Sequence, residues 1–515
     1  MKSFISRRDF LKLAGLVPLS WLTLKGLAKF RTITDRPSIQ EYSPKKNVLI
    51  VVFDAWSAAN MSLYGYGRQT TPNLEQLAAK AVVYHNHFAG GNYTNPGTAS
   101  LLTGTLPWTH RALQIGDSVE KTFVNKNIFQ VFKDRYRFAY THNPSAYHIL
   151  NHFSSNIDRL LPWERFYLDS DAFIDTLFRA DEDIATISWG QAFKQLSGYS
   201  YSLYLSQIYQ MIKDRQFKGF RQIVENFPRG LPNHDHYTYF TLEDGIDGLE
   251  SQVSAASQPF LGYYHFFPPH DPYSTRKDFA ETFTLDDYRP SEKPKHIFHD
   301  DKPDYYINEQ RAWYDEFILY VDNEFTRLYH FLEQHGILGN TWLVLTSDHG
   351  ELFERGILGL ITRVLYQPVI HIPLLIFPPG QTTRVDVYEA TSAIDLLPTL
   401  MHVTDQNIPN WIEGSVLTPF SASTTSSDRD VFAFHGSTNE KGQIIKGTAM
   451  IVRGNLKLIW YFGYEEFENP EMIELYDIQI DPEELNDLSL TQKEIADDLL
   501  RTLKLKLEEA DAGYK

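Results

Sequence analysis

The sequence predicts an α/β protein with a mostly parallel sheet flanked by helices, followed by a small antiparallel C-terminal α+β subdomain. Asn47–Phe53 is a continuous apolar, largely β-branched run, which is typical of a strand buried on both faces of a parallel sheet. A helix signal and then a second strand follow over residues 72–88, so the chain starts a β-α-β alternation. Beyond about residue 425 the pattern changes to short alternating strands, a turn at Glu474–Asp477 and a final charged helix from Thr491 to about Glu509. We therefore expect a main α/β domain over residues 45–424 and a subdomain over 425–515.

Composition limits the kinds of partner. The chain has 515 residues, a formal net charge of −17 and no cysteine. This charge argues against nucleic acid as a partner, because phosphate backbones are bound by basic surfaces. The lack of cysteine excludes disulfides, thiolate zinc sites and a cysteine nucleophile. An anionic substrate would need a local positive feature, such as a bound cation.

The first 28 residues predict export. Ser6–Lys12 carries the pattern of a twin-arginine signal, and the apolar stretch Leu13–Leu24 after it is shorter than the roughly 20 residues that span a bilayer. Small residues near Ala28 suit cleavage there. We expect a twin-arginine signal peptide over residues 1–28 and a mature protein in the periplasm, the cell envelope or outside the cell. If uncleaved, this segment would be the membrane attachment.

The stretch Asn92–Gly104 predicts a short helix with a reactive hydroxyl at its start. Pro96 suits the first helical position and Gly104 suits the residue after the helix. Thr94 would then lie just before unpaired N–H groups that can bind an anion, beside Asn95 as a substrate-binding residue. A threonine hydroxyl is a poor nucleophile unless a base or a metal ion activates it.

Two further segments predict a metal site. Asp54 follows the strand at 47–53, and Asp348 and His349 follow a second apolar strand at 341–346. Sites in open α/β sheets form beyond the carboxyl ends of strands. With Thr94 these side chains would make a mononuclear site for one divalent cation. The mixed ligands favour Zn²⁺ or Mn²⁺, and Ca²⁺ is possible.

Among the histidines, His270 is the strongest candidate for the substrate site. It follows the predicted strand Leu261–Phe267 and lies between prolines that stiffen its loop. We expect a structural role for His110, and the spacing of His142, His148 and His152 is too irregular for a metal site. Residues 162–253 read as a mostly helical insertion, either a cap over a pocket or a plain structural addition.

These motifs together resemble the sulfatase branch of the alkaline phosphatase superfamily. The matching stretches run in order over nearly the whole chain, and are Asn47–Asp54, Tyr64–Ala78, Thr94–Gly104, Pro268–Tyr273, Ser347–Glu351, Ile372–Gly380, Asp395–Leu400 and Leu475–Leu485. The resemblance implies an alkaline-phosphatase-like fold and makes Asp54, Asp348 and His349 metal ligands. It puts Thr94 at the nucleophile position and His270 beside the anionic group of the substrate.

The sequence departs from the sulfatase pattern where the chemistry takes place. Sulfatases have a cysteine or serine, converted to formylglycine, where this chain has Thr94, and an arginine where it has Thr98. The second acid after the first strand is Ala55, and the Gly-Lys pair expected after Tyr140-Thr141 is missing. The site is therefore more similar to the threonine-dependent phosphodiesterases and phosphotransferases of the superfamily.

We therefore expect an exported metal-dependent hydrolase or transferase that forms a covalent Thr94 intermediate, with phosphate esters preferred. The substrate would be an anionic ester of a small molecule, glycan or lipid. One alternative is a sulfuric ester hydrolase that uses unmodified Thr94. The other is a catalytically silent binding protein of the cell envelope. The sequence does not indicate an oligomeric state.

Overall fold

The computed structural model describes residues 45–169, 221–235, 238–360, 362–421 and 429–514. The predicted signal peptide at 1–28 and much of the predicted insertion at 162–253 therefore lie outside the described residues. Within the described ranges, no helix combines the length and the apolar character needed to span a bilayer.

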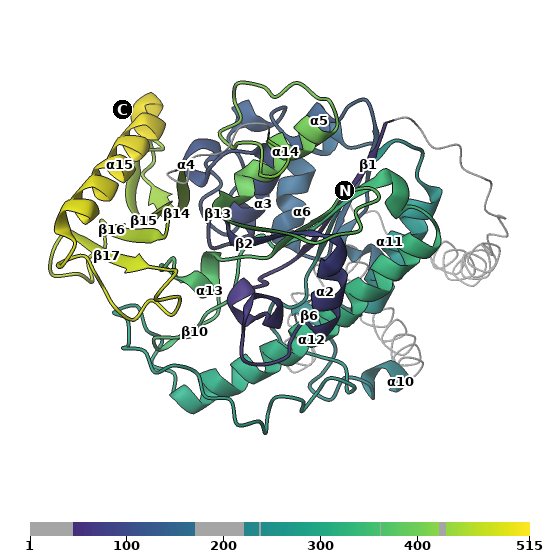
Figure 1. Cartoon of the computed structure of the whole chain (residues 1–515), viewed down its shortest axis with the longest axis horizontal. Helices are drawn as coiled ribbons and strands as arrows, with labels where there is room; N and C mark the ends of the chain where they lie inside the picture. The colour runs from purple at the N-terminus through teal and green to yellow at the C-terminus, as the bar shows by residue number, and fades with distance from the viewer. Residues whose placement is uncertain (1–44, 170–220, 236–237, 361, 422–428, 515) are drawn as a thin grey trace, which may run out of the picture. The chain divides into compact units, whose positions relative to one another are not determined.

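An eight-stranded sheet forms the centre of the main domain (Figure 1). Its strands in spatial order are β13 (Val385–Ser392), β2 (Val82–Phe88), β12 (Leu374–Phe377), β9 (Thr341–Thr346), β1 (Asn47–Phe53), β8 (Phe260–Phe266), β3 (Tyr136–Thr141) and β4 (Arg159–Leu160). β12 runs antiparallel to both its neighbours, and the other pairs are parallel. This confirms the predicted mostly parallel sheet.

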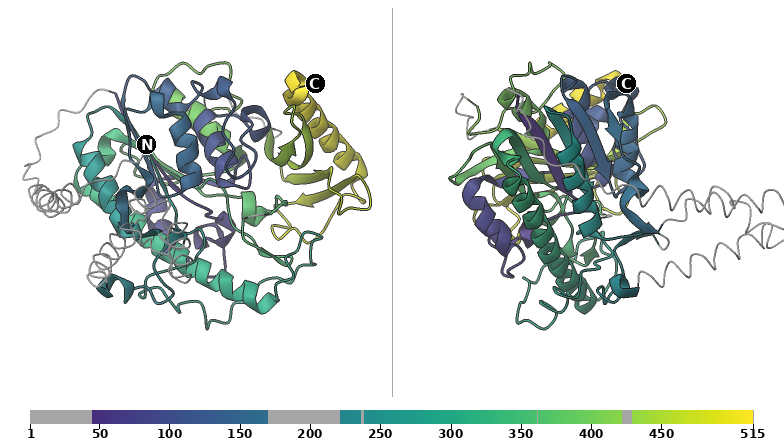
Figure 2. Two further views of the ribbon diagram at one scale, coloured as in Figure 1. Left: turned by 180° about the vertical axis from the view of Figure 1, so that it is seen from behind. Right: turned by 90° about the vertical axis from the view of Figure 1, so that its right-hand side faces the viewer.

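Helices cover both faces of this sheet (Figure 2). On one face are α2 (Pro72–Leu77), α11 (Leu242–Ala255) and α12 (Asp304–Gln334); on the other are α3 (Thr94–Thr103), α5 (Ile128–Val131), α6 (Pro144–His152) and α14 (Leu396–Val403). Side chains of β1 alternate between the two layers: Leu49, Val51 and Phe53 pack toward α11 and α12. Val48, Ile50 and Val52 pack on the opposite side. Because both faces of β1 are covered by apolar helices, the strand is apolar throughout.

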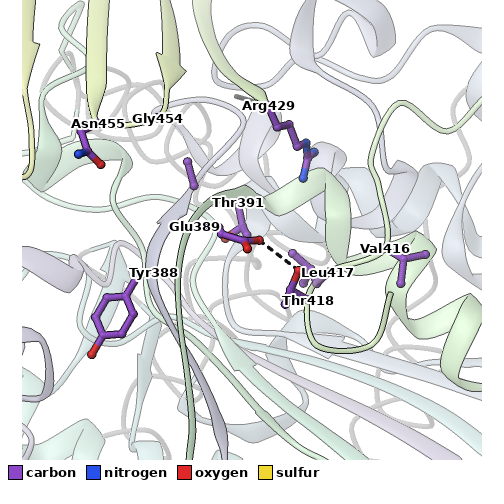
Figure 3. A pocket seen from close by; sticks show the side chains of 10 residues that line it. Tyr388, Glu389, Thr391, Val416, Leu417, Thr418, Arg429, Gly454 and Asn455 are labelled. Carbon is purple, nitrogen blue, oxygen red and sulfur yellow. Dashed lines mark hydrogen bonds between the residues drawn. The ribbon is translucent and has the colours of Figure 1, made fainter. Parts of the chain in front are cut away.

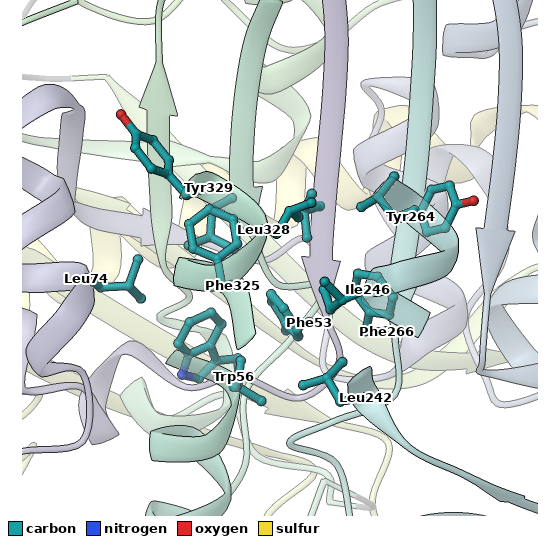
Figure 4. Packing of buried hydrophobic residues seen from close by; sticks show 14 of the residues in the cluster. Phe53, Trp56, Leu74, Leu242, Ile246, Tyr264, Phe266, Phe325, Leu328 and Tyr329 are labelled. Carbon is teal, nitrogen blue, oxygen red and sulfur yellow. The ribbon is translucent and has the colours of Figure 1, made fainter. Parts of the chain in front are cut away.

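The larger core joins β1 and β8 to helices α11 and α12 (Figure 4). Phe53 lies at its centre, with ring centroids 5.4 Å from both Trp56 and Phe266. Phe325 of α12 and Ile246 of α11 close over the same group. These contacts fix the carboxyl end of β1, where Asp54 follows.

The C-terminal part is an antiparallel sheet with one helix, as predicted. It consists of β14 (Asp430–Thr438), β15 (Ile444–Arg453), β16 (Leu456–Phe462), β17 (Glu471–Asp477) and α15 (Lys493–Asp511). The prediction of a turn at 474–477 was wrong, because these residues belong to β17 and pair with β16. Leu475 packs in the core beneath α15, and the half-buried Glu474 carboxylate accepts hydrogen bonds from two tyrosine hydroxyls. Because these two hydroxyls bind its carboxylate, the glutamate is accommodated within a strand.

A buried ion pair links this C-terminal sheet to the main domain. Lys457 on β16 lies 2.6 Å from the Glu484 carboxylate, and both side chains are fully buried. The other Glu484 oxygen accepts the N–H of Gln367, at 2.8 Å, the first residue of α13 (Gln367–Ile370). Carbonyls of α13 in turn accept the N–H groups of Gly350 and Glu351. The chain just after His349 is therefore held through α13 by the C-terminal sheet.

The described part of the predicted insertion is less helical than expected. It includes a three-stranded sheet of β5 (Tyr167–Asp169), β7 (Thr238–Phe240) and β6 (Asn233–Asp235), in that order. The ring of Phe240 stacks on His142, at the end of β3, with centroids 4.4 Å apart. This small sheet therefore packs next to the carboxyl end of the central sheet.

Candidate metal centre and active site

Three buried side chains meet at the carboxyl ends of β1 and β9. These strands are parallel neighbours, so the residues after them, Asp54 and Asp348, lie side by side. Ligand atoms of Asp54, Asp348 and His349 all lie within 4.8 Å of one another. The Nε2 atom of His349 is 3.4 Å from Asp54 Oδ1 and 3.6 Å from Asp348 Oδ2. The structure thus brings together the three residues predicted as metal ligands.

The donor set of this group fits a divalent cation. Asp54 Oδ1 and Asp348 Oδ2 are buried and have no hydrogen-bond partner among the described residues. His349 Nδ1 lies 2.9 Å from the Gly350 carbonyl and must donate to it, which leaves Nε2 as the unprotonated atom. Burying unpaired carboxylate oxygens is costly unless a cation neutralises them. Two such oxygens and one imidazole nitrogen are suitable ligands for Zn²⁺ or Mn²⁺.

Thr94 lies at this group, at the start of α3. Its Oγ1 atom is 3.4 Å from His349 Nε2 and 3.3 Å from the Nδ2 atom of Asn143. The helix begins at Thr94 itself, so the prediction that Pro96 is the first helical residue was wrong. Pro96 is tolerated as the third residue because the first N–H groups of a helix have no intrahelical partner in any case. Gly104 ends the helix in the left-handed conformation, as predicted.

A glycine lets α3 approach the metal-ligand loop. A Cβ atom built on Gly97 would lie 2.3 Å from the backbone oxygen of Asp348, which is closer than real Cβ contacts allow. The helix therefore packs directly on the backbone of a predicted metal ligand. This contact keeps Thr94 at a fixed distance from Asp348 and His349.

Asn143 was not among the predicted site residues, although it contacts two of them. Its Oδ1 atom caps α6 by accepting the N–H of Ser145, and its Nδ2 atom donates to Asp54 Oδ2 at 2.5 Å and to Thr94 at 3.3 Å. The Asn-Pro sequence after β3 is a helix-start signal and pointed only to the capping role.

His265 is a second buried polar residue that was not among the predicted site residues. It lies on β8, where it pairs with Val52 of β1 and with Thr141 of β3. Its Nε2 atom is 3.2 Å from Asp54 Oδ2 and 3.7 Å from Asp348 Oδ2. The sequence shows a histidine within an otherwise apolar and aromatic strand, which could have singled out this residue. The sequence does not show which side chains that histidine contacts.

Charge in the site depends on the neighbours of each group. Burial opposes ionisation of Asp54, but the close approach of His265 and the nearby charges of His270 and His349 outweigh burial and lower its pKa to about 2. For Asp348, burial and the charge of Asp54 raise the pKa. Two adjacent buried carboxylates repel each other, so the site favours the binding of positive charge.

His270 follows β8 in the predicted loop. Its Nδ1 atom lies 2.7 Å from the Asp271 carbonyl and 3.0 Å from the Asp271 carboxylate. Burial alone would lower the His270 pKa, but Asp271 raises it to about 10. The pKa of Asp54 is lowered by the charge of His270, so the ring lies near the metal-ligand group. The imidazole is therefore positively charged at neutral pH.

Sequence comparisons place this arrangement in a known family. A family model described as Sulfatase matches residues 46–406, and one described as N-sulphoglucosamine sulphohydrolase, C-terminal, matches residues 359–513. The chain belongs to the sulfatase family. Among curated relatives of this family member, an arylsulfatase of Clostridium perfringens is 23% identical, covering 91% of this chain and 96% of the relative. The multifunctional alkaline phosphatase superfamily protein PehA of Trinickia caryophylli is also 23% identical, covering 75% and 78%.

Solved structures give the same fold. The phosphonate monoester hydrolase of Agrobacterium radiobacter matches with a TM-score of 0.63 at 19% identity, covering 92% of this chain and 96% of that one. A 2-O GAG sulfatase matches with a TM-score of 0.61 at 16% identity, covering 91% and 93%. The sulfatase-family chain thus has the alkaline-phosphatase-like fold, and it is a hydrolase of this superfamily.

Asn95 does not join the other predicted site residues of this sulfatase-family hydrolase. Its side-chain nitrogen donates to the Asp117 carbonyl at 2.9 Å, and its oxygen accepts the N–H of Gly116 at 3.1 Å. The amide thus holds the loop at residues 116–117 against the start of α3. The substrate-binding role of Asn95 stays a prediction, and these contacts give it a structural one.

Glu351 is a further buried acid near the site that the sequence reading did not select. It follows His349 by two residues, and neither carboxylate oxygen has a hydrogen-bond partner among the described residues. Burial raises its pKa well above the usual value, and the charge of His270 only partly offsets this. Burial thus disfavours the charged form of Glu351.

Other histidines are structural in this sulfatase-family fold. His110 is buried, and its Nε2 atom lies 3.1 Å from the Ser100 hydroxyl. His142 stacks on Phe240, whereas His148 lies 2.6 Å from the Ser118 hydroxyl. None of these contacts involves Asp54, Asp348 or His349.

A surface hollow lies apart from the metal-ligand group (Figure 3). It has a volume of about 250 Å³ beside the edge strand β13, and its lining includes Tyr388, Thr391, Leu417, Arg429 and Asn455. A hydrogen bond from the Thr418 hydroxyl to Glu389 crosses it. None of the site residues lines this hollow.

Proposed function

We propose that this sulfatase-family hydrolase cleaves anionic phosphate esters in preference to sulfate esters, using the Thr94 hydroxyl as nucleophile and one divalent cation. The observation that supports this most is the position of Thr94 Oγ1, 3.4 Å from His349 Nε2 and beside two buried carboxylates. A hydroxyl at that distance can share a cation with these ligands.

Asp54, Asp348, His349 and Thr94 would hold the cation. When bound, a divalent ion lowers the pKa of a hydroxyl and polarises an ester oxygen. The mixed oxygen and nitrogen donors favour Zn²⁺ or Mn²⁺, with Ca²⁺ as the less suitable ion.

The protein supplies three further functions. The Nδ2 group of Asn143 orients Thr94 Oγ1 for attack on phosphorus. As the new P–O bond forms and the ester P–O bond breaks, the N–H groups at the start of α3 stabilise the developing negative charge. His270, which is protonated at neutral pH, donates a proton to the leaving oxygen. The Thr94 proton leaves to solvent, and attack of water on phosphorus then releases phosphate and restores the hydroxyl.

Thr94 is the reason to prefer phosphate over sulfate. Threonine cannot become formylglycine, so a sulfated Thr94 has no hemiacetal route for release of sulfate. The phosphoryl group of a phosphorylated Thr94 is removed by in-line attack of water on phosphorus, or of an alcohol if the enzyme transfers the group.

The test is mass spectrometry of the Thr94 peptide after brief exposure to an aryl phosphate, a bis-aryl phosphate or an aryl sulfate. We expect a phosphoryl adduct on Thr94 and faster turnover of at least one phosphate ester than of the aryl sulfate. The Thr94→Ala variant should show neither the adduct nor the turnover. Chelation of the divalent cation is expected to abolish turnover, with recovery on adding Mn²⁺ or Zn²⁺. Dominant aryl sulfate turnover would contradict the proposal.

The second candidate is a sulfuric ester hydrolase with unmodified Thr94. The family model and the arylsulfatase relative favour it. A sulfated Thr94 peptide would be its signature. If the protein binds no metal, or if Thr94→Ala leaves its activity unchanged, a silent binding protein becomes the better account.

We also propose export by the twin-arginine route to the periplasm or cell envelope, based on Ser6–Lys12. A reporter fused to residues 1–45 should leave the cytoplasm, and changing both Arg7 and Arg8 to Lys should retain it. One structural neighbour is a 2-O GAG sulfatase, and another was solved in complex with k-i-k-neocarrahexaose, which supports a glycan ester among the substrates to be tried.

A further inference from the structure

We propose that His265 is a positioning residue: its imidazole holds the carboxylates of Asp54 and Asp348 at the spacing that a shared cation needs, without ligating that cation. The proposal rests on the metal dependence proposed above. It adds a residue that neither the sequence motifs nor the predicted site contains.

The strand pairing explains how His265 reaches both carboxylates. β8 lies next to β1, and His265 of β8 pairs with Val52 of β1. Asp54 comes two residues after Val52, so the His265 backbone lies two residues before Asp54 along the strand direction. Asp348 follows β9 on the other side of β1. His265 is fully buried and its ring packs near Tyr263, with centroids 6.3 Å apart. An imidazole at this position has no access to solvent and must find its partners within the protein.

Distances separate the role of His265 from that of His349. His265 Nε2 approaches Asp54 at Oδ2, at 3.2 Å, whereas His349 Nε2 approaches the other oxygen, Oδ1, at 3.4 Å. The Asp54 Oδ2 atom also accepts the hydrogen bond from Asn143. One oxygen of Asp54 therefore faces protein donors, and the other faces the Thr94 and His349 side, where the cation would bind.

The second nitrogen of the ring indicates its tautomer. Nδ1 lies 3.3 Å from the Tyr263 hydroxyl. If that hydroxyl donates to Nδ1, the ring proton is on Nε2 and faces the carboxylates. Nε2 lies 3.2 Å from Asp54 Oδ2 and 3.7 Å from Asp348 Oδ2 and makes an aligned hydrogen bond with neither, so it lies between the two carboxylates. A neutral imidazole in this tautomer can donate toward both acids.

This contact offsets a repulsion that the site cannot avoid. Asp54 and Asp348 are both fully buried, and two adjacent carboxylates separate unless a donor or a cation lies between them. Donors behind metal ligands orient them, and their loss typically weakens metal binding about 10- to 100-fold. His265 is thus expected to set the affinity for the cation through the positions of its ligands.

The experiment measures Mn²⁺ affinity of the full-length protein by titration after removal of bound metal. We expect His265→Phe to bind Mn²⁺ about 10- to 100-fold more weakly than the wild type. We expect His265→Gln, which keeps an N–H donor, to recover most of that loss. Unchanged affinity in a folded His265→Phe variant overturns the proposal.

His87 provides a matched control. It is fully buried on β2, its Nδ1 atom lies 2.9 Å from the Thr391 hydroxyl, and its Nε2 atom has no partner among the described residues. His87→Phe is expected to leave Mn²⁺ affinity unchanged if it folds. A loss equal to that of His265→Phe would mean that any buried histidine has this effect, and would overturn the proposal.

Two further measurements keep the proposal testable. Electron spin-echo spectroscopy of bound Mn²⁺ should detect one imidazole nitrogen, from His349, in the wild type and in His265→Gln; two in the wild type would make His265 a ligand and overturn the proposal. If His265→Phe does not fold, Tyr263→Phe removes the hydroxyl that sets the tautomer. It should bind Mn²⁺ several-fold more weakly, and unchanged affinity there overturns the proposal. Because affinity is measured without substrate, an unmodified Thr94 would contradict the proposed reaction and leave this inference standing.

Discussion

One amide side chain, that of Asn143, has four hydrogen-bond partners at the centre of the site. Asn143 caps α6 through its oxygen and, through its nitrogen, donates to Asp54 and Thr94. The cap stabilises the fold, whereas the two donated contacts place a ligand and the nucleophile. These roles involve opposite ends of the same amide, so substitutions can separate them.

Asn143→Asp is expected to keep the helix cap and lose the donor. Aspartate caps helices as well as asparagine does, so the melting temperature should stay near that of the wild type. The new carboxylate would face Asp54 without a proton to donate, and turnover should fall about 10- to 100-fold. Steady-state kinetics and thermal unfolding measure the two effects.

Asn143→Ala is the companion variant. It removes both roles and should lose about 1 kcal/mol of stability in addition to activity. Full activity in Asn143→Asp, with Asp54 and Thr94 unchanged, would show that the amide nitrogen does not position the nucleophile.

Residues that directly follow a strand were the ones that could be predicted. Asp54, Asp348 and His349 each come after a strong apolar run, and the carboxyl ends of parallel strands share one edge. His265 could not be predicted in the same way, because its role depends on the register of β8 against β1. Register between strands about 200 residues apart is set by packing of the whole sheet, and no local pattern reports it.

At the scale of elements, the contact between α3 and the loop after β9 decides the geometry of the site. Gly97 makes that contact possible, since a Cβ atom there would lie 2.3 Å from the Asp348 carbonyl oxygen. The obstacle is backbone, so the helix or the loop would have to move. Either movement changes the distance from Thr94 to His349.

Gly97→Ala is therefore expected to destabilise the protein by about 1–3 kcal/mol, the usual cost of overpacking, and to reduce turnover strongly. Urea unfolding and kinetics measure these effects. Gly339→Ala is the control, because a Cβ atom at that position meets nothing within 4 Å. Wild-type activity in Gly97→Ala would contradict the tight packing of α3 on the Asp348 loop.

Helices and strands were predicted well where the apolar periodicity was strong. They were predicted less well where tertiary contacts decided the type or the bounds of the element. The strands at 47–53 and 341–346 are present as predicted. The start of α3 was misplaced, because Pro96 is allowed anywhere in the first turn. Residues 474–477 were predicted as a turn but pair with β16, and two tyrosine hydroxyls from other strands and loops bind the Glu474 carboxylate there.

At the scale of the whole molecule, the Lys457–Glu484 pair connects the C-terminal sheet to α13 of the main domain. Lys457→Met would leave the Glu484 carboxylate buried without its cation, which typically costs about 3–5 kcal/mol. Urea unfolding should show this loss, and the Mn²⁺ affinity should fall too, because Glu484 holds α13 and α13 holds the chain after His349.

Lys504→Met is the matched control for this prediction. Lys504 pairs with Glu471 at 2.7 Å, but the two side chains are 40% and 42% exposed. Exposed pairs contribute roughly 0–1 kcal/mol, so this variant should unfold almost as the wild type does. Equal effects of the two substitutions would mean that burial of the Lys457 pair has no special importance.

The link from Glu484 through α13 to Gly350 has a consequence for the biosynthesis of the protein. Asp54, Thr94, Asp348 and His349 leave the ribosome well before Lys457 and Glu484, and the chain after two of them takes part of its support from these later residues through α13. A chain that ends before Glu484 has all the strands of the central sheet in its sequence but lacks the carboxylate that accepts the Gln367 N–H. We therefore expect the proposed cation site to reach its full affinity only once translation is complete, and fragments released early to bind the cation more weakly.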